Sequence, residues 1–417
     1  MNMPPILAAL GRHKPSVALI TLQVALTLAI VCNAVFVIGQ RVARVSRPTG
    51  LDENNLIFVH QHFMNAPSAG SASDADRLDS LVQQDMAALR GIPGVKSVAS
   101  VDVVPLSYGM LFTALSTKPK FNQKDRSSYS SISEYTMGAQ GLSTLGLKLV
   151  AGRNFRSTEV QHGALSFNIS TPVIMITRAV ARHLFPDGKA LGKTVYLAGK
   201  PSRVIGVLAR LQTQGTGGFN SAFAYNSVVL PYRMDWDGAS YAIRTQPGQL
   251  HAVMQAVRKT LYKVNPLRVI EDSGVQSFGQ IRASAYKSDI GMAILMGVIC
   301  MILLCITGAG MVGITSFWVN QRRKQIGIRR ALGATRRDIL RYFQLENLMI
   351  AGTGVVLGAL LGIGLNLWLM KLYSMDRMPV GYVAIGVILL LLLGQIAVFA
   401  PARRASNVPP VVATRSV

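Results

Sequence analysis

Four long stretches without a charged side chain limit what this chain can fold into. They cover residues 15–40, 290–321, 347–370 and 378–402. Each is longer than the roughly 20 apolar residues that cross ~30 Å of hydrocarbon. Charged residues make up only 15% of the chain, whereas soluble globular proteins average about 25%. The sequence therefore predicts an α-helical membrane protein with four transmembrane helices, at 16–40, 289–320, 345–372 and 379–401.

Basic residues beside the spans predict the orientation, because they collect on the cytoplasmic side. The segment 321–344 carries eight of them, and the tail 402–417 adds three. We therefore expect residues 1–15, this segment and the tail in the cytoplasm, and the loop 373–378 in the periplasm. The first span exceeds the apolar core of a signal peptide, about 7–15 residues, so we expect a retained anchor. The protein is then a multi-pass membrane protein with one large segment outside the cytoplasm.

Residues 41–288 form the one large segment outside the membrane in this topology. They hold 28 basic and 15 acidic residues, an excess of 13 positive charges. Such a surface favours either an anionic partner or simple solubility, and the sequence leaves both open. The three cysteines all lie inside spans, so no disulfide framework is expected in this domain.

The periplasmic domain repeats one pattern near its two ends. A strand-like segment, a helix with one apolar face and a second strand-like segment occupy 55–104, and the same order recurs in 240–272. This predicts two β-α-β units, a porter-like part at 50–132 and 225–285, interrupted by an inserted mixed subdomain at 133–224. Within the insert, 171–185 favours a strand followed by a helix, 193–209 favours a hairpin, and 212–224 favours a loop.

The second span is unusually long. Thirty-two uncharged residues would make about 48 Å of helix at ~1.5 Å per residue, which exceeds the hydrocarbon thickness. Tilt explains the excess, and so does a helix that continues beyond the bilayer as a stalk.

Two sequence features resemble chemical sites. Residues 186–194 resemble a phosphate-binding loop, but the glycine spacing is wrong and a helix precedes where a strand is required. His60 and His62 share one face of a strand, yet no acid or third histidine lies close in sequence, so we expect no metal site. We find no spacing typical of a catalytic triad or carboxylate pair. The sequence predicts no enzyme active site, no directly bound cofactor and no nucleic-acid partner.

Gly354, Gly358 and Gly362 recur at every fourth position of the third span. Such a ridge lets another helix approach closely. Packing within the four helices and a subunit interface are both open alternatives.

The basic segment contains more than charge. Thr335 and Asp338 have the spacing of a capping box, which predicts a short helix starting near Arg336 after a bend at Gly333. Ile339 and Phe343 then share one face of that helix. Attachment to anionic lipid explains the arginines. A docking element for a cytoplasmic partner explains both the arginines and the capped helix.

The segment "RRKQIGIRRALGATRRDILRYFQLE" closely resembles the cytoplasmic loop of FtsX-like permeases of the MacB type, the type VII ABC transporter family. "GIPGVKSVASVDVVP", "STLGLKLVAGRNF" and "ARHLFPDGKALGKTVYLAGKPSRVIGVLA" resemble that family's periplasmic domain, and "PARRASNVPPVVATR" resembles its tail. The positions that match the loop are Gly327, Ile328, Arg329, Arg330, Ala331, Leu332, Gly333, Ala334 and Thr335. With Asp338, Ile339 and Phe343, they are the expected ATPase-coupling residues.

The resemblance implies a permease subunit that is one half of a dimer, either a homodimer or a heterodimer with a paralogous permease. A cytoplasmic ABC ATPase would dock on the loop and supply ATP hydrolysis, which reshapes the periplasmic domains by mechanotransmission for export or efflux. A periplasmic adaptor and an outer-membrane channel are further expected partners besides the lipid bilayer. Because only fifteen residues precede the first span, we expect the ATPase on a separate chain.

Two departures from the family pattern concern the proposed contacts. Gln325 stands where the family usually has glutamate, and Val412 and Thr414 change the usual ending of the tail.

The alternative function is a non-transporting envelope scaffold or regulator, which would activate a cell-envelope hydrolase or take part in lipoprotein release.

Overall fold

The computed structural model describes residues 14–64, 66, 72–107, 112–120, 125, 127–164, 169–215, 223–373 and 377–407. The chain divides into two compact units. Residues 1–45 and 288–417 form a membrane unit, and Ser46–Lys287 form a separate domain. Much of the N-terminus 1–15, the middle of the loops 212–224 and 373–378, and the tail positions Val412 and Thr414 lie outside the described residues.

Among the residues that the structure describes, four helices are long and apolar enough to cross a membrane, which confirms the predicted number. They are α2 (Lys14–Val45), α7 (Phe278–Gln321), α9 (Arg336–Tyr373) and α10 (Val380–Ser406). A shorter helix, α8 (Arg323–Ala331), lies between α7 and α9 in the chain. The 44 residues of α7 form one continuous helix, about 66 Å long at ~1.5 Å per residue. It begins well before the predicted start at 289, inside the segment assigned to the separate domain.

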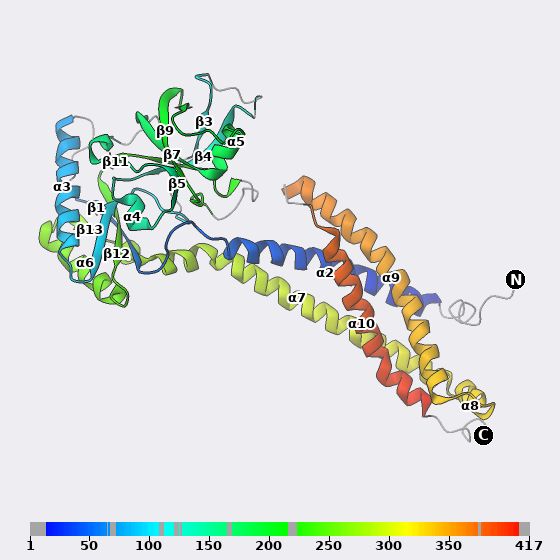
Figure 1. Cartoon of the computed structure of the whole chain (residues 1–417). Helices are drawn as coiled ribbons and strands as arrows, with labels where there is room; N and C mark the ends of the chain where they lie inside the picture. The colour runs from blue at the N-terminus through cyan, green and yellow to red at the C-terminus, as the bar shows by residue number, and fades with distance from the viewer. Residues whose placement is uncertain are drawn as a thin grey trace. The chain divides into compact units, whose positions relative to one another are not determined.

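The helices of the membrane unit pack unequally. α9 lies along both α2 and α10 (Figure 1), around an apolar core that includes Val24, Leu28 and Leu390. α7 meets α2 through polar groups, with Thr27 Oγ1 2.8 Å from Thr307 Oγ1 and Gln23 Nε2 donating to the Ile306 carbonyl at 3.1 Å. Many large apolar side chains of α7 are exposed, as suits contact with lipid or another apolar surface.

The first sheet of the separate domain contains both predicted β-α-β units. Its strands are β1 (Leu56–Phe63), β2 (Val95–Ser100), β12 (Gly238–Thr245), β13 (Arg268–Val269) and β14 (Val275–Ser277), and its helices are α3 (Ala72–Arg90) and α6 (Leu250–Val264). The order is β13-β1-β12-β2, with β14 also pairing with β1. The two units interleave, because β12 lies between β1 and β2, and β1 lies between β12 and β13. Antiparallel pairing of Leu56 with Arg244 and of Phe58 with Ala242 joins them.

The helices α3 and α6 cover this sheet with a common apolar core. Leu78, Val82 and Leu89 of α3 and Val253 and Val257 of α6 are buried there with Ile57, Val59, Tyr241 and Ile243 of the strands. The periodic apolar residues of the two predicted helices thus meet at one interface. This arrangement confirms the predicted α+β class with two β-α-β units.

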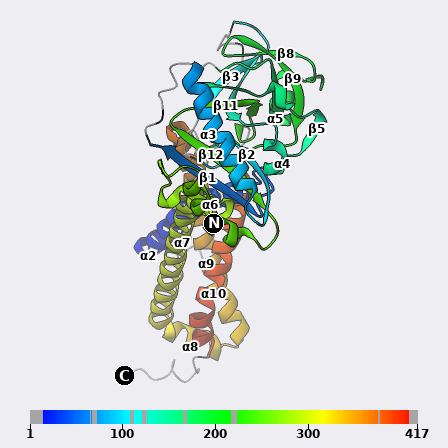
Figure 2. The same ribbon diagram turned by 90° about the vertical axis from the view of Figure 1, so that its left-hand side faces the viewer.

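A second sheet forms the remainder of the domain (Figure 2). Its order is β5-β9-β7-β10-β4-β3-β8, and an additional β8–β9 pairing closes six strands into a ring. The bounds are β3 (Phe112–Ser116), β4 (Tyr129–Thr136), β5 (Leu149–Gly152), β7 (Val173–Thr177), β8 (Thr194–Leu197), β9 (Lys200–Leu208) and β10 (Ser227–Leu230). Short helices α4 (Gly141–Leu145) and α5 (Arg178–Leu184) and a ribbon of β6 (Gln161–Ala164) with β11 (Tyr232–Asp235) complete the domain.

The second sheet confirms the predicted hairpin, β8–β9, and the predicted strand and helix, β7 and α5. Its membership extends beyond the predicted insert 133–224, because β3 lies before that range and β10 after it. Leu115 of β3 and Val228 of β10 are buried in this second core. β3 and β10 are only five and four residues long, and a pattern this short fits either sheet. The boundary of the insert is therefore set by tertiary packing.

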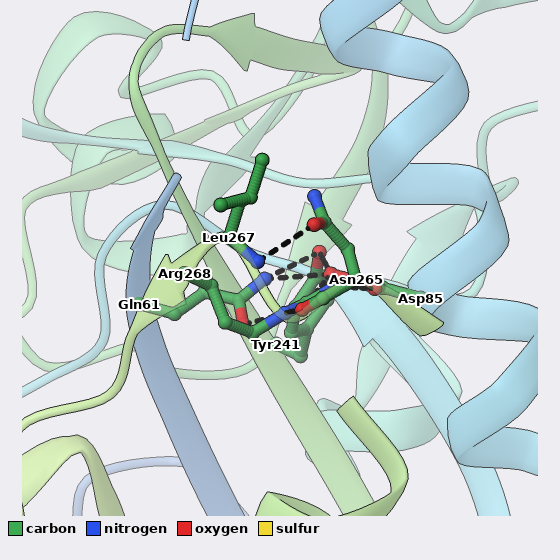
Figure 3. A network of polar contacts seen from close by, with 6 residues as sticks. All are labelled: Gln61, Asp85, Tyr241, Asn265, Leu267 and Arg268. Carbon is green, nitrogen blue, oxygen red and sulfur yellow. Dashed lines mark hydrogen bonds and ion pairs between the residues drawn. The ribbon is translucent and has the colours of Figure 1, made fainter. Parts of the chain in front are cut away.

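A fully buried ion pair lies in the first sheet (Figure 3). Both terminal guanidinium nitrogens of Arg268 donate to Asp85, Nη1 to Oδ2 at 2.7 Å and Nη2 to Oδ1 at 2.9 Å. Gln61 and Tyr241 also donate to Asp85 Oδ2, at 2.6 and 2.9 Å, and Arg268 Nη1 donates to Gln61 Oε1 at 2.7 Å. These four side chains come from β1, α3, β12 and β13. The network therefore joins the two interleaved units by charge-assisted hydrogen bonds.

Removing one partner of this pair should destabilise the domain strongly. Asp85→Asn leaves the Arg268 charge buried without a counter-ion, and such changes cost about 3–5 kcal/mol. Urea unfolding of the detergent-purified chain, followed by Trp236 fluorescence in a Trp318→Phe, Trp368→Phe background, measures the loss. Lys118→Gln breaks an exposed pair with Asp125 and should have no measurable effect. An Asp85→Asn protein as stable as the Lys118→Gln control would contradict the assigned role of the pair.

Candidate functional site

The basic segment bends at Gly333, as its sequence predicts. Gly333 has a φ of +102°, a left-handed conformation that only glycine adopts without strain. The amide of Ala334 donates to the Arg329 carbonyl at 3.0 Å, and that of Leu332 donates to the Ile328 carbonyl at 3.0 Å. These bonds satisfy the last carbonyls of α8 and end the helix.

A capping box starts the next helix, also as predicted. The Thr335 amide and Oγ1 donate to Asp338 Oδ2 at 2.9 and 2.7 Å, and the Asp338 amide donates to Thr335 Oγ1 at 3.2 Å. The prediction of a short helix here is wrong, because α9 continues to Tyr373. No glycine or proline occurs between Arg336 and Ala351, so nothing ends the helix before it becomes the third span.

The expected docking role of Ile339 and Phe343 requires exposed side chains, and the structure buries both. Ile339 is 4% exposed and Phe343 is 3% exposed. They pack against Val319, Ile326, Val398 and Ala402 from α7, α8 and α10. Their helical spacing reflects the core of this helix cluster instead of a surface for a partner.

Two apolar side chains of the segment remain accessible. Leu332, directly before the bend, is 82% exposed, and Ile328, one turn earlier on α8, is 45% exposed. Of the other matching positions, Gly327 is buried, Arg330 and Ala334 are half-buried, and Arg329, Ala331, Gly333 and Thr335 are exposed, as is Asp338. The accessible surface around the bend is thus an apolar pair among polar and basic groups.

Three of the eight basic side chains contact the rest of the membrane unit. Arg322 Nη1 contacts both carboxylate oxygens of Glu346 at 3.0 and 3.1 Å, and its guanidinium lies 5.8 Å from the Trp318 ring centre. Arg330 Nη1 donates to the Ser406 carbonyl at 3.1 Å. Arg329 lies 5.0 Å over the ring of Tyr342. Neither lipid attachment nor docking accounts for these three contacts, which hold the segment on α7, α9 and α10.

Glu346 is a residue that sequence reasoning missed. Its side chain is 2% exposed and pairs α9 with the end of α7. A signal was present, because Glu346 is the only acidic residue between Asp338 and Asp376. A lone carboxylate at the start of a span is expected to have a cationic partner.

The three span glycines all face α2. A Cβ atom on Gly358 would lie 2.7 Å from the Ala25 carbonyl oxygen, and one on Gly354 would lie 2.8 Å from Val24 Cβ. A Cβ on Gly362 would lie 3.4 Å from Ala29 Cα. The structure therefore places this ridge inside the four-helix set, the first of the two alternatives.

The remaining sequence features lie in the separate domain. His60 and His62 have ring centres 5.0 Å apart and both lie beside Trp236. In the part of the chain that the structure describes, they belong to no group of three potential metal ligands. Residues 186–194 form the turn between α5 and β8, with positive φ at Gly188 and Gly192.

Two family models match this chain over nearly its whole length. The MacB-like periplasmic core domain matches residues 18–260, and the FtsX-like permease C-terminal region matches residues 280–410. The "Uncharacterized ABC transporter permease YknZ" of Bacillus subtilis (strain 168) is 26% identical over 347 residues, 80% of this chain and 78% of that protein.

Proteins named "Macrolide export ATP-binding/permease protein MacB" also match. The one from Agrobacterium fabrum is 29% identical over 292 residues, 66% of this chain and 42% of that protein. The one from Neisseria meningitidis serogroup B is 31% identical over 244 residues, 56% of this chain and 34% of that protein. This chain therefore spans less than half the length of these relatives.

The chain belongs to the MacB-like, FtsX-like family of ABC transporter permeases. Permeases of this family work with a cytoplasmic ATPase. The match to the FtsX-like region includes α7, the bend at Gly333, and the helices α9 and α10. The match to the MacB-like domain includes α2 and all of the sheets except β13 and β14.

The packing of α2 on α9 in this permease gives a direct prediction. Gly358→Val places side-chain atoms against the Ala25 backbone, and overpacking of this kind costs about 1–3 kcal/mol. Gly364→Val is the matched control, because its Cβ would have nothing within 4 Å. Thermal unfolding in detergent should show a lowered midpoint for Gly358→Val and not for Gly364→Val. Equal midpoints for the two variants would rule out close packing at Gly358.

Proposed function

We propose that this protein is the membrane subunit of an ABC exporter in the bacterial inner membrane, powered by a cytoplasmic ATPase on a separate chain. ATP hydrolysis would move the transmembrane helices and reshape the periplasmic domain, so that export of a substrate is driven by mechanotransmission. The observation that carries the proposal is the exposure of Leu332 and Ile328 at a bend whose surroundings are fixed to three transmembrane helices.

The contacts around the bend support transmission of movement. Ile326 of α8 packs in one cluster with Val319 of α7, Ile339 of α9 and Val398 of α10. Arg330 is bonded to the end of α10, and the pair of Arg322 with Glu346 joins α7 to α9. A partner that displaces α8 would displace these helix ends together, because packed clusters move as units instead of deforming continuously.

The long helix α7 supports the second step of the proposal. It is uninterrupted from Gln321 to Phe278, and β14 ends at Ser277, directly before it. β14 pairs with β1 at Ile57, Phe58 and Val59. A shift or rotation of α7 at its cytoplasmic end would thus act on the first sheet of the periplasmic domain.

The names of the relatives support a separate ATPase. The Bacillus subtilis relative, of which this chain covers 78%, is named a permease, whereas the MacB relatives are named ATP-binding/permease proteins. The further partners are proposals from the family resemblance: a second permease copy or paralogue, a periplasmic adaptor and an outer-membrane channel. The exposed Arg336 and Arg337 suit contact with anionic lipid beside the docked ATPase.

A charge at the exposed apolar pair should uncouple the ATPase. In Leu332→Asp the folded chain should still insert, because Leu332 contributes little to the core at 82% exposure. Docking would bury the new carboxylate without a partner, which is strongly unfavourable. Detergent extracts should yield about tenfold less co-purified ATPase, and stimulated ATP hydrolysis should fall in proportion.

Leu191→Asp is the matched control, since Leu191 is an exposed leucine of the periplasmic domain, 41% accessible. It should leave ATPase recovery and turnover unchanged. The double substitution Arg336→Ala, Arg337→Ala distinguishes attachment to lipid from docking of the ATPase. Loss of lipid contact would lower membrane insertion more than it lowers ATPase recovery. Normal ATPase recovery and turnover in Leu332→Asp would refute docking at the bend.

A further inference from the structure

Three potential metal ligands that are far apart in sequence meet in the periplasmic domain. They are Asp79 of α3, His162 of β6 and Asp235 of β11, and one ligand atom of each lies within 4.8 Å of those of the others. A fourth candidate, Asp76 of α3, has Oδ1 3.7 Å from His162 Nε2. The site is unrelated to the bend at Gly333 and goes beyond the proposed function.

The fold brings these residues together through the small β6–β11 ribbon. The two strands pair in parallel, with Arg233 opposite His162 and Asp235 opposite Ala164. The ribbon packs on α3, which carries both other acids. β11 also connects β10 of the second sheet to β12 of the first, so the cluster lies where the chain passes between the two sheets.

The imidazole of His162 is held between carboxylates. Its Nδ1 lies 2.8 Å from Asp235 Oδ2, and its Nε2 faces Asp76. A histidine that binds a metal through one ring nitrogen commonly has a carboxylate on the other, which fixes the tautomer and the ring orientation. The side chain of His162 is 32% exposed, which leaves the cluster open to ions from solution.

Asp235 gives an independent indication of a cation-binding role. Its side chain is 1% exposed, and Oδ1 is buried without a hydrogen-bond partner among the described residues. Oδ1 belongs to the same carboxylate as Oδ2, which contacts the imidazole. Burial raises the pKa of Asp235, although His162 opposes this effect. A buried acceptor without a donor is unfavourable, and a bound cation would remove this cost.

Arg233 does not fill the site. Its Nε donates to Asp79 Oδ1 at 2.7 Å, so it neutralises one acid through one oxygen, and a carboxylate has a second oxygen that can bind a metal ion. Asp235 and Asp76 then supply two negative charges, which would balance one divalent cation.

The geometry points to a binding site for one divalent metal ion of the zinc class, formed by Asp79, His162 and Asp235 with Asp76 at its rim. Mixed imidazole and carboxylate ligands favour Zn²⁺ over the oxygen-seeking Ca²⁺ and Mg²⁺. Zinc bonds of about 2.0–2.2 Å place ligand atoms roughly 3.4 Å apart. His162 Nδ1 and Asp235 Oδ2, which lie 2.8 Å apart, would therefore separate slightly on binding, and Asp79 would approach them. The bound ion would fix the ribbon to α3.

Zinc binding to the untagged full chain in detergent tests this site. After treatment with a chelator, the protein is dialysed against micromolar ZnCl₂, and zinc per chain is measured by atomic emission. His162→Ala and Asp79→Asn should each weaken the tightest binding by at least about tenfold. His251→Ala, which removes an exposed histidine of α6, should bind like the wild type. Zinc should also raise the thermal midpoint of the wild type and His251→Ala, but not of His162→Ala.

Two results would overturn the assignment. One is a wild-type stoichiometry no higher than that of His162→Ala, and the other is tight binding that Ca²⁺ displaces as readily as Zn²⁺. Circular dichroism checks the fold of each variant. If His162→Ala is misfolded, Asp79→Asn takes its place, and its zinc stoichiometry is compared with that of the wild type in the same way.

Discussion

Antiparallel pairing of β1 with β12 is the constraint on which the separate domain (Ser46–Lys287) depends. Each strand belongs to a different β-α-β unit, and each lies between the two strands of the other unit. Neither unit can be removed without exposing the apolar faces of α3 and α6, which share one core. The pair of Asp85 with Arg268 adds a directional contact among four elements of this sheet. Because β14 also pairs with β1, the strand that precedes α7 is part of the same sheet.

The bend at Gly333 has two parts with separate physical roles. One part is fixed: the buried faces of α8 and α9, the pair of Arg322 with Glu346, and the bond from Arg330 to Ser406. The other part is exposed: Ile328 and Leu332 beside a glycine in a left-handed conformation. An exposed apolar group on a rigid support suits an interface anchor, because little ordering is needed when a partner binds. This division is why the bend, instead of the whole basic segment, is proposed as the coupling surface.

Local patterns in the sequence predicted the features that depend on local chemistry. Charge-free stretches located the four spans, the Thr335–Asp338 spacing located a helix start, and repeated strand-helix-strand patterns located both β-α-β units. Features set by distant contacts were missed or misassigned. Ile339 and Phe343 have the spacing of an amphipathic helix, but spacing does not say whether the apolar face meets a partner or the chain itself. In the same way, β3 and β10 join a sheet that their short patterns do not specify, and Asp79, His162 and Asp235 become neighbours only through the fold.

Photo-crosslinking at the bend tests the central claim most directly. A photoreactive amino acid replaces Leu332 in the full chain, and a second protein carries it at Leu191 as the control. After illumination of intact membranes, adducts are identified by mass spectrometry. The account predicts that position 332 captures an ABC-type ATPase and that position 191 does not. Adducts of position 332 with lipid alone, under conditions in which the ATPase is present in the membrane fraction, would contradict it.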